Sequence, residues 1–94
     1  MADKMRVKSI RDIYPYIMSS DYQNRFIGEY MELCYRIHKL EAMLTKAEDG
    51  ELDFALNCPI TLLESQLISM RGYKKVLEVR AEVEKITFPE VIYG

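Results

Sequence analysis

Residues 21–44 read DYQNRFIGEYMELCYRIHKLEAML, and their apolar side chains recur at steps of three and four residues. This spacing predicts an α-helix that packs against an antiparallel or coiled-coil partner helix. Ser20 and Gln23 have the spacing of a capping box, so we expect the helix to begin near Asp21. The predicted seam consists of Tyr22, Phe26, Tyr30, Leu33, Ile37, Leu40 and Leu44, and the opposite, polar side includes Arg36, Lys39 and Lys46.

A second long helix is expected to follow a loop. The Asp-Gly pair at 49–50 ends the first helix, and Pro59, together with Thr61 and Glu64 at capping spacing, places the start of the second between Asn57 and Thr61. In the loop, Leu52, Phe54 and Leu56 alternate and are expected to plug the open end of the hairpin.

The second helix carries two apolar stripes, which imply two packing partners. One stripe consists of Leu63, Leu67, Met70, Leu77 and Ala81, and the other of Tyr73, Val76, Val79, Val83 and Ile86. The first helix, folded back as a hairpin, is one partner. The other is the N-terminal segment or a second chain.

The two ends of the chain flank this hairpin. Pro15 is expected to end or kink a short N-terminal helix near Ile13, and Pro89 lies in an extended arm, TFPEVIYG, that docks or frays. The sequence therefore predicts an all-α fold: an antiparallel helical hairpin of two long helices with a short N-terminal helix and an extended C-terminal arm. The predicted single domain, 1–94, comprises an N-terminal segment (1–20), the hairpin (21–86) and the tail (87–94).

Composition limits the classes of partner. The formal net charge is −2, and the charges of both signs are interspersed, which argues against a nucleic-acid groove. There is neither an apolar run long enough to span a bilayer nor a signal-peptide pattern, so we expect a cytoplasmic protein without membrane contact. Ninety-four residues form only a small core, which favours a homo-oligomer.

Residues 67–84, LISMRGYKKVLEVRAEVE, contain the candidate site. Gly72 costs helix stability, and such a residue usually marks the close approach of another helix or a ligand. Basic side chains nearby suit phosphates, and tyrosine rings suit a base. The candidate ligand-binding residues are Arg71, Gly72, Tyr73, Lys75, Arg80 and Tyr35.

A purely structural interpretation of the same segment stays open. The pairs Lys74–Glu78 and Arg80–Glu84 have the spacing of ordinary surface ion pairs. Lys75 is the exception, because Arg71 repels it from four residues back. That conflict favours a bound anion.

No catalytic or metal-binding pattern can be assembled from the sequence. His38 is the only histidine, and no cluster of Cys, Asp or Glu at ligand spacing surrounds it. The serines have no neighbouring base. Cys34 and Cys58 are interpreted as reduced packing residues. We therefore expect no catalysis, metal or cofactor.

Several motifs between residues 21 and 84 carry a family resemblance. These are DY at the first helix start, LDF in the loop, CP before the second helix, the LLE-Q run and VLEVRAEVE. With them the chain resembles a family of small phage and prophage proteins related to a gene product of a crAss-like phage. The N-terminal segment and the tail lie outside this resemblance.

A looser likeness, of architecture alone, connects the hairpin with the anti-CBASS and anti-Thoeris sponges. It implies a phage counter-defence protein in the cytoplasm of the infected bacterial host. Such a protein would sequester a cyclic nucleotide or cyclic ADP-ribose signal between protomers. The alternative is a protein-binding inhibitor of a host defence effector such as a CRISPR nuclease.

Overall fold

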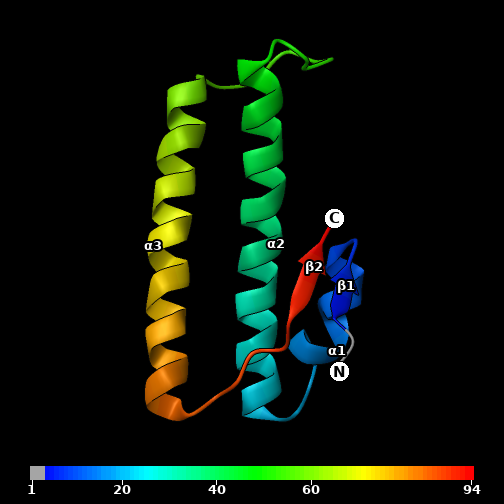
Figure 1. The fold of residues 1–94 in the computed structure, drawn as a ribbon, viewed down its shortest axis with the longest axis vertical. Coiled ribbons are helices and arrows are strands. Elements are labelled where there is room, and N and C mark those ends of the chain that lie inside the picture. Colours follow the sequence, from blue (N-terminus) through cyan, green and yellow to red (C-terminus); the bar gives the residue numbers. More distant parts are fainter. Residues whose placement is uncertain (1–3) are drawn as a thin grey trace.

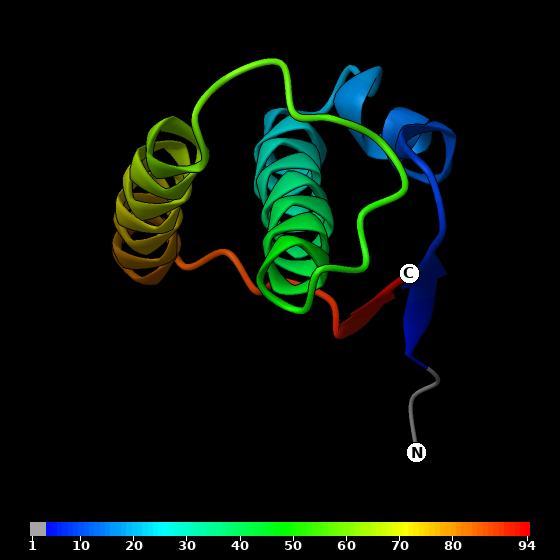
Figure 2. The same cartoon turned by 90° about the horizontal axis from the view of Figure 1, so that it is seen from above.

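The computed structural model describes residues 4–94. Along the chain the elements are β1 (Met5–Val7), the 3-10 helix η1 (Ile10–Ile13), α1 (Tyr14–Ile17), α2 (Tyr22–Glu48), α3 (Ile60–Glu84) and β2 (Val91–Tyr93). The long helices lie side by side and run in opposite directions (Figure 1). Seen from above, α2 lies between α3 and the N-terminal elements (Figure 2). The middle helix therefore contacts both remaining parts of the molecule.

The ends of α2 follow from local chemistry. The Asp21 carboxylate accepts a hydrogen bond from the Gln23 backbone N–H at 2.9 Å. Asp21 is thus the N-cap, and the predicted cap at Ser20 is wrong. At the other end Gly50 has φ 70°, a left-handed conformation that glycine adopts without strain, so the predicted stop at 49–50 is confirmed.

The start of α3 lies where the sequence predicts it. Pro59 is the N-cap, and Ile60 is the first helical residue. The predicted Thr61–Glu64 capping box falls inside the helix instead of at its N-cap. After Glu84, Lys85 adopts a left-handed φ of 58°, and the Ile86 N–H bonds to the Ala81 carbonyl at 2.9 Å. This turn sends the chain away from α3.

The core between α2 and α3 matches most of the predicted seam. Leu33, Ile37 and Leu67 are 6–8% exposed, and Leu77 is fully buried. Tyr22, also predicted in the seam, is 48% exposed. The buried cluster consists of Phe26, Leu33, Ile37, Leu40, Leu44, Leu67, Leu77, Ala81 and Ile86.

The N-terminal elements pack on α2 through a close backbone contact. An added Cβ at Gly28 would lie 2.9 Å from the Ile17 backbone nitrogen, so the glycine permits this approach. Ile13 and Met31 are buried in the same contact. Pro15 lies in the first turn of α1, which begins directly after η1, so the short helix is broken near Ile13 as predicted.

The second stripe of α3 receives no partner from the described part of the chain. Tyr73, Val76, Val79 and Val83 are 44%, 55%, 47% and 76% exposed, and only Ile86 of this stripe is buried. The N-terminal segment, one of the two predicted partners, covers α2 instead. A second chain is the predicted partner that stays open.

The C-terminal arm docks as a strand. β2 pairs in parallel with β1, with Met5 opposite Val91 and Val7 opposite Tyr93. On the way, the Phe88 ring stacks on Tyr30 with centroids 3.8 Å apart. The fold is therefore mostly helical, but the all-α prediction needs correction for this strand pair. No helix in the described residues combines the length and apolar character needed to cross a membrane.

Candidate functional site

A cavity of about 640 Å³ opens between α2, α3 and the loop 49–59, and we call it the loop cleft. Its volume is within the range of small-molecule sites, about 300–1,000 Å³. The loop forms part of its wall through Leu52 and Phe54, and Phe54 is 56% exposed. The apolar lining consists of Leu40, Met43, Leu52, Phe54 and Met70.

Basic and aromatic side chains of α2 line the same cleft. Tyr35, Arg36, Lys39 and Lys46 all contribute to its wall. The Lys39 ammonium lies 6.0 Å from the centre of the Tyr35 ring, and Arg36 forms an ion pair with Glu32 at 3.1 Å. Among residues 4–94, no carboxylate lies within ion-pairing distance of Lys39 or Lys46. Their charges are available to a ligand.

The loop contributes two carboxylates to the cleft. Glu51 and Asp53 both line it, and the Glu51 backbone N–H bonds to the Lys46 carbonyl at 2.8 Å. This bond fixes the start of the loop beside the last turn of α2. The cleft thus contains charges of both signs around an apolar floor.

This combination suits a planar molecule with an anionic group. Methionine, leucine and phenylalanine side chains offer contact to a flat ring, and tyrosine can stack on it. Lysine and arginine offer charge-assisted hydrogen bonds to a phosphate. A nucleotide has both parts.

Of the six residues predicted as a site, Tyr35 alone is among the lining residues of the loop cleft. Its hydroxyl donates a hydrogen bond to the Lys8 carbonyl at 3.4 Å, which connects the cleft wall to the N-terminal segment. The other five lie on α3.

Arg71 is part of the contact between the two long helices. Its guanidinium donates a hydrogen bond to the Glu41 carboxylate at 2.7 Å, with both side chains about half exposed. The charge of Arg71, a candidate ligand-binding residue, is therefore already paired across the hairpin.

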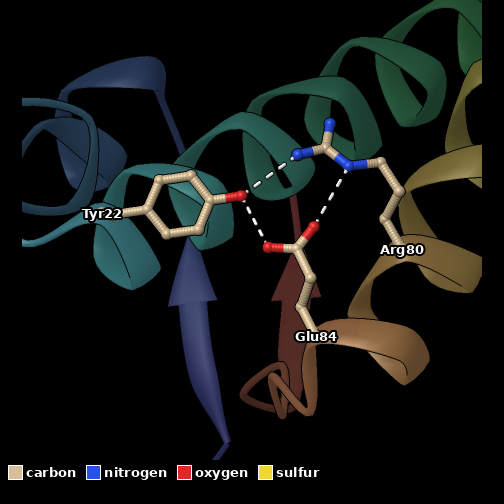
Figure 3. A network of polar contacts seen from close by, with 3 residues as sticks. All are labelled: Tyr22, Arg80 and Glu84. Carbon is tan, nitrogen blue, oxygen red and sulfur yellow. Dashed lines mark hydrogen bonds and ion pairs between the residues drawn. The ribbon is translucent and has the colours of Figure 1, made fainter.

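Arg80 belongs to a network of polar contacts where α2 begins and α3 ends (Figure 3). It donates hydrogen bonds to the Tyr22 hydroxyl at 3.1 Å and to Glu84 at 3.3 Å, and Tyr22 donates to Glu84 at 2.6 Å. The bond to Glu84 raises the pKa of the Tyr22 hydroxyl. The predicted Arg80–Glu84 pair is therefore present, and the bonds that both residues form with the Tyr22 hydroxyl connect the end of α3 to the start of α2.

Gly72, Tyr73 and Lys75 are exposed on α3. Nothing lies within 4 Å of a Cβ built on Gly72, so within the described chain this glycine does not mark a close contact. With about 100° of rotation per residue, Arg71 and Lys75 lie on one side of α3, and Tyr73 and Arg80 on nearly the opposite side. The five residues of α3 do not converge on one cavity, and their role in ligand binding stays a prediction.

A second cavity of about 340 Å³ lies beneath the C-terminal arm. Cys34 borders it, and burial raises the pKa of this thiol, so it stays protonated and unreactive near neutral pH. Burial likewise raises the pKa of Tyr93 on the arm. Within residues 4–94 no group of three or more His, Cys, Asp or Glu side chains could hold a metal ion.

The loop cleft was missed because its two halves were interpreted separately. Arg36, Lys39 and Lys46 were assigned to the polar side of the first helix, and Leu52 and Phe54 to a plug for the open end of the hairpin. Both features were visible in the sequence. Apolar loop residues beside a row of cations are the signal that could have located the cleft.

Comparison with known proteins places the chain in a family. The family model described as Sequestin matches residues 20–83, which contain almost all of α2 and α3 and the loop between them. No curated protein and no solved structure matches the chain. Since the matched region is well over half of the 94 residues, this chain belongs to the Sequestin family.

Proposed function

We propose that this protein is a non-catalytic, phage-encoded counter-defence protein. It binds a cyclic nucleotide or cyclic ADP-ribose immune signal and withholds it from its receptor in the cytoplasm of the infected bacterial host. The family description, Sequestin, agrees with sequestration. The observation that carries the proposal is the loop cleft, in which Lys39 and Lys46 border an apolar floor large enough for a nucleotide.

Binding in the cleft needs no chemistry beyond contact and charge. The base contacts the floor around Met43 and Met70, and the phosphate takes hydrogen bonds from the basic side chains of α2. Such a protein acts by mass action. It must bind tightly enough to keep the concentration of free signal below the concentration that activates the receptor.

A thermal-shift panel tests the proposal. A ligand at 100 times its Kd stabilises a protein by about 2.7 kcal/mol, which raises the Tm of a domain of this size by roughly 10–20 °C. We expect such a shift for at least one cyclic di- or trinucleotide or cyclic ADP-ribose isomer. No shift across the panel would contradict the proposal.

Charge variants assign the shift to the cleft. Lys39→Glu places a like charge beside the phosphate and should abolish the shift. Lys85→Glu makes the same change at the exposed turn after α3 and should keep it. Equal shifts for both variants would place the ligand elsewhere.

The alternative function, inhibition of a host defence effector such as a CRISPR nuclease by protein contact, has one observation in its favour. We define the outer face of α3 as Gly72, Val76, Val79 and Val83, and its three valines are 47–76% exposed. Exposed apolar patches of this kind mark interaction sites. On this alternative, binding of an effector protein would stabilise the chain, whereas nucleotides would leave its stability unchanged.

The same face is where we propose that the protein forms a homo-oligomer. A second copy would cover the valines that the N-terminal segment leaves exposed. Light scattering at micromolar concentration should then report a dimer or larger species, and Val76→Glu should reduce its mass. A monomeric parent would remove self-association from the proposal.

A further inference from the structure

The two ends of the loop cleft differ in charge. Arg36 and Lys39 lie at one end, and the loop carboxylates Glu51 and Asp53 lie at the other, beside Lys46. With a rise of about 1.5 Å per residue, Lys39 lies about 10 Å and Arg36 about 15 Å below Lys46 along α2. The loop lies where α2 ends and α3 begins, away from β1 and β2 (Figure 1). The cleft is therefore polarised along α2.

We infer that the cleft binds a nucleotide in one orientation, with the phosphate at Arg36 and Lys39 and the ribose hydroxyls on Glu51 and Asp53. This inference rests on the proposed function and adds the direction of the ligand and the group that the loop recognises. Its ligand class is a nucleotide that keeps free ribose hydroxyls.

The phosphate is directed to the lower end by charge. Near the loop, the carboxylates of Glu51 and Asp53 repel a phosphate and offset the positive charge of Lys46. At the lower end Lys39 has no carboxylate within ion-pairing distance in the described chain. Arg36 shares its guanidinium with Glu32, which leaves further N–H donors for a phosphate.

The hydroxyls are directed to the loop by hydrogen bonding. An ionised carboxylate is an acceptor only, so it pairs with a hydroxyl donor and not with a phosphate oxygen. Acidic side chains bind ribose hydroxyls in this way in dinucleotide-binding folds. The base then lies between the two ends of the cleft, on the apolar surface around Met43 and Phe54.

Matched ligands test the orientation. We would measure binding of 5′-AMP, its 2′,3′-dideoxy analogue and adenosine by calorimetry or ligand-detected NMR, and repeat the comparison with 3′,5′-cyclic AMP and its 2′-deoxy analogue. The parent should bind the hydroxylated member of each pair at least tenfold more tightly, because a charge-assisted hydrogen bond is lost in the other. Adenosine should bind more weakly than 5′-AMP.

Two double variants separate the ends of the cleft. In Glu51→Gln/Asp53→Asn, the preference for hydroxyls should shrink to less than threefold. In Arg36→Gln/Lys39→Gln, 5′-AMP should bind no better than adenosine, while the preference for hydroxyls persists. Glu48→Gln, a control at the same end of α2 that lines the groove on the other side of the hairpin, should behave as the parent.

The outcomes distinguish this inference from the proposed function. If neither this set nor the cyclic panel binds the parent, the proposed function is wrong and the inference falls with it. If nucleotides bind but the deoxy analogues bind equally well, or only panel members outside the two pairs bind, the orientation alone is overturned. The orientation would also be overturned if the Glu51→Gln/Asp53→Asn variant lost the same factor of affinity for both members of a pair.

Discussion

Each long helix has a glycine beside apolar residues on the face that points away from the other long helix, but the two faces have different surroundings. On α2, Gly28 is buried against the backbone of Ile17, and Met31 beside it is 1% exposed. On α3, Gly72 has nothing within 4 Å of an added Cβ, and Val76 beside it is 55% exposed. A glycine next to apolar residues in a helix therefore marks a contact only where the chain supplies the partner.

The difference follows from where the ends of the chain go. β1, η1 and α1 cover α2, and β2 joins β1 on that same side (Figure 1). The elements that form this cover, within residues 5–17 and 91–93, lie outside the Sequestin match. The matched hairpin thus presents one face to its own termini and leaves the other available.

The largest effect is expected in the core between the helices. Leu77→Ala removes a fully buried side chain and should lower the free energy of unfolding by about 2–5 kcal/mol. Val83→Ala, on the outer face of α3, should change it by less than about 0.5 kcal/mol in the monomer. Urea unfolding of both variants measures the contrast, and similar losses would mean that the outer face is also buried.

The two glycines provide the sharpest comparison. Gly28→Ala places a methyl group 2.9 Å from a backbone nitrogen, and such overpacking costs about 1–3 kcal/mol, more than the gain in helix propensity. In the monomer, Gly72→Ala meets open space and should raise the free energy of unfolding by about 0.5–1 kcal/mol. Thermal melts should shift in opposite directions. Destabilisation by Gly72→Ala would indicate a close partner there, such as a second chain.

The smallest effect concerns the cations of α3. Arg71→Ala removes a half-exposed ion pair with Glu41 and should cost about 0–1 kcal/mol, whereas Lys75→Ala should cost less. Melting at low and high salt distinguishes them, because screening reduces an ion-pair contribution. A salt-independent loss for Arg71→Ala would assign its effect to packing of the side-chain stem.

The hairpin could be predicted from the sequence because its signals are local. The three-and-four spacing of Leu33 and Ile37, the stop at Gly50 and the start at Pro59 each depend on neighbours within a few residues. The strand pair could not be predicted, because β1 and β2 are separated by more than eighty residues and each is only three residues long. The N-terminal cover of α2 escaped prediction for a related reason, since nothing local says which helix it contacts.

The residues of a binding site are harder to predict from the sequence than the fold. Gly72 and the cations around it were the most unusual local feature, yet Arg71 and Arg80 form bonds that connect the two helices. The loop cleft depends on the path that the loop 49–59 takes beside the end of α2, and that path is a tertiary property. Tyr35, which was predicted because a tyrosine ring can stack on a base, lines the loop cleft.

Chemical-shift mapping tests the central claim most directly. Backbone amide spectra of the parent, titrated with the nucleotide that gives the largest thermal shift, report which residues the ligand approaches. We predict that the largest changes occur at residues 35–46 and 51–54, with little change along residues 71–80. Changes concentrated at 71–80, or no changes at saturating ligand, would contradict the assignment of the loop cleft as the binding site.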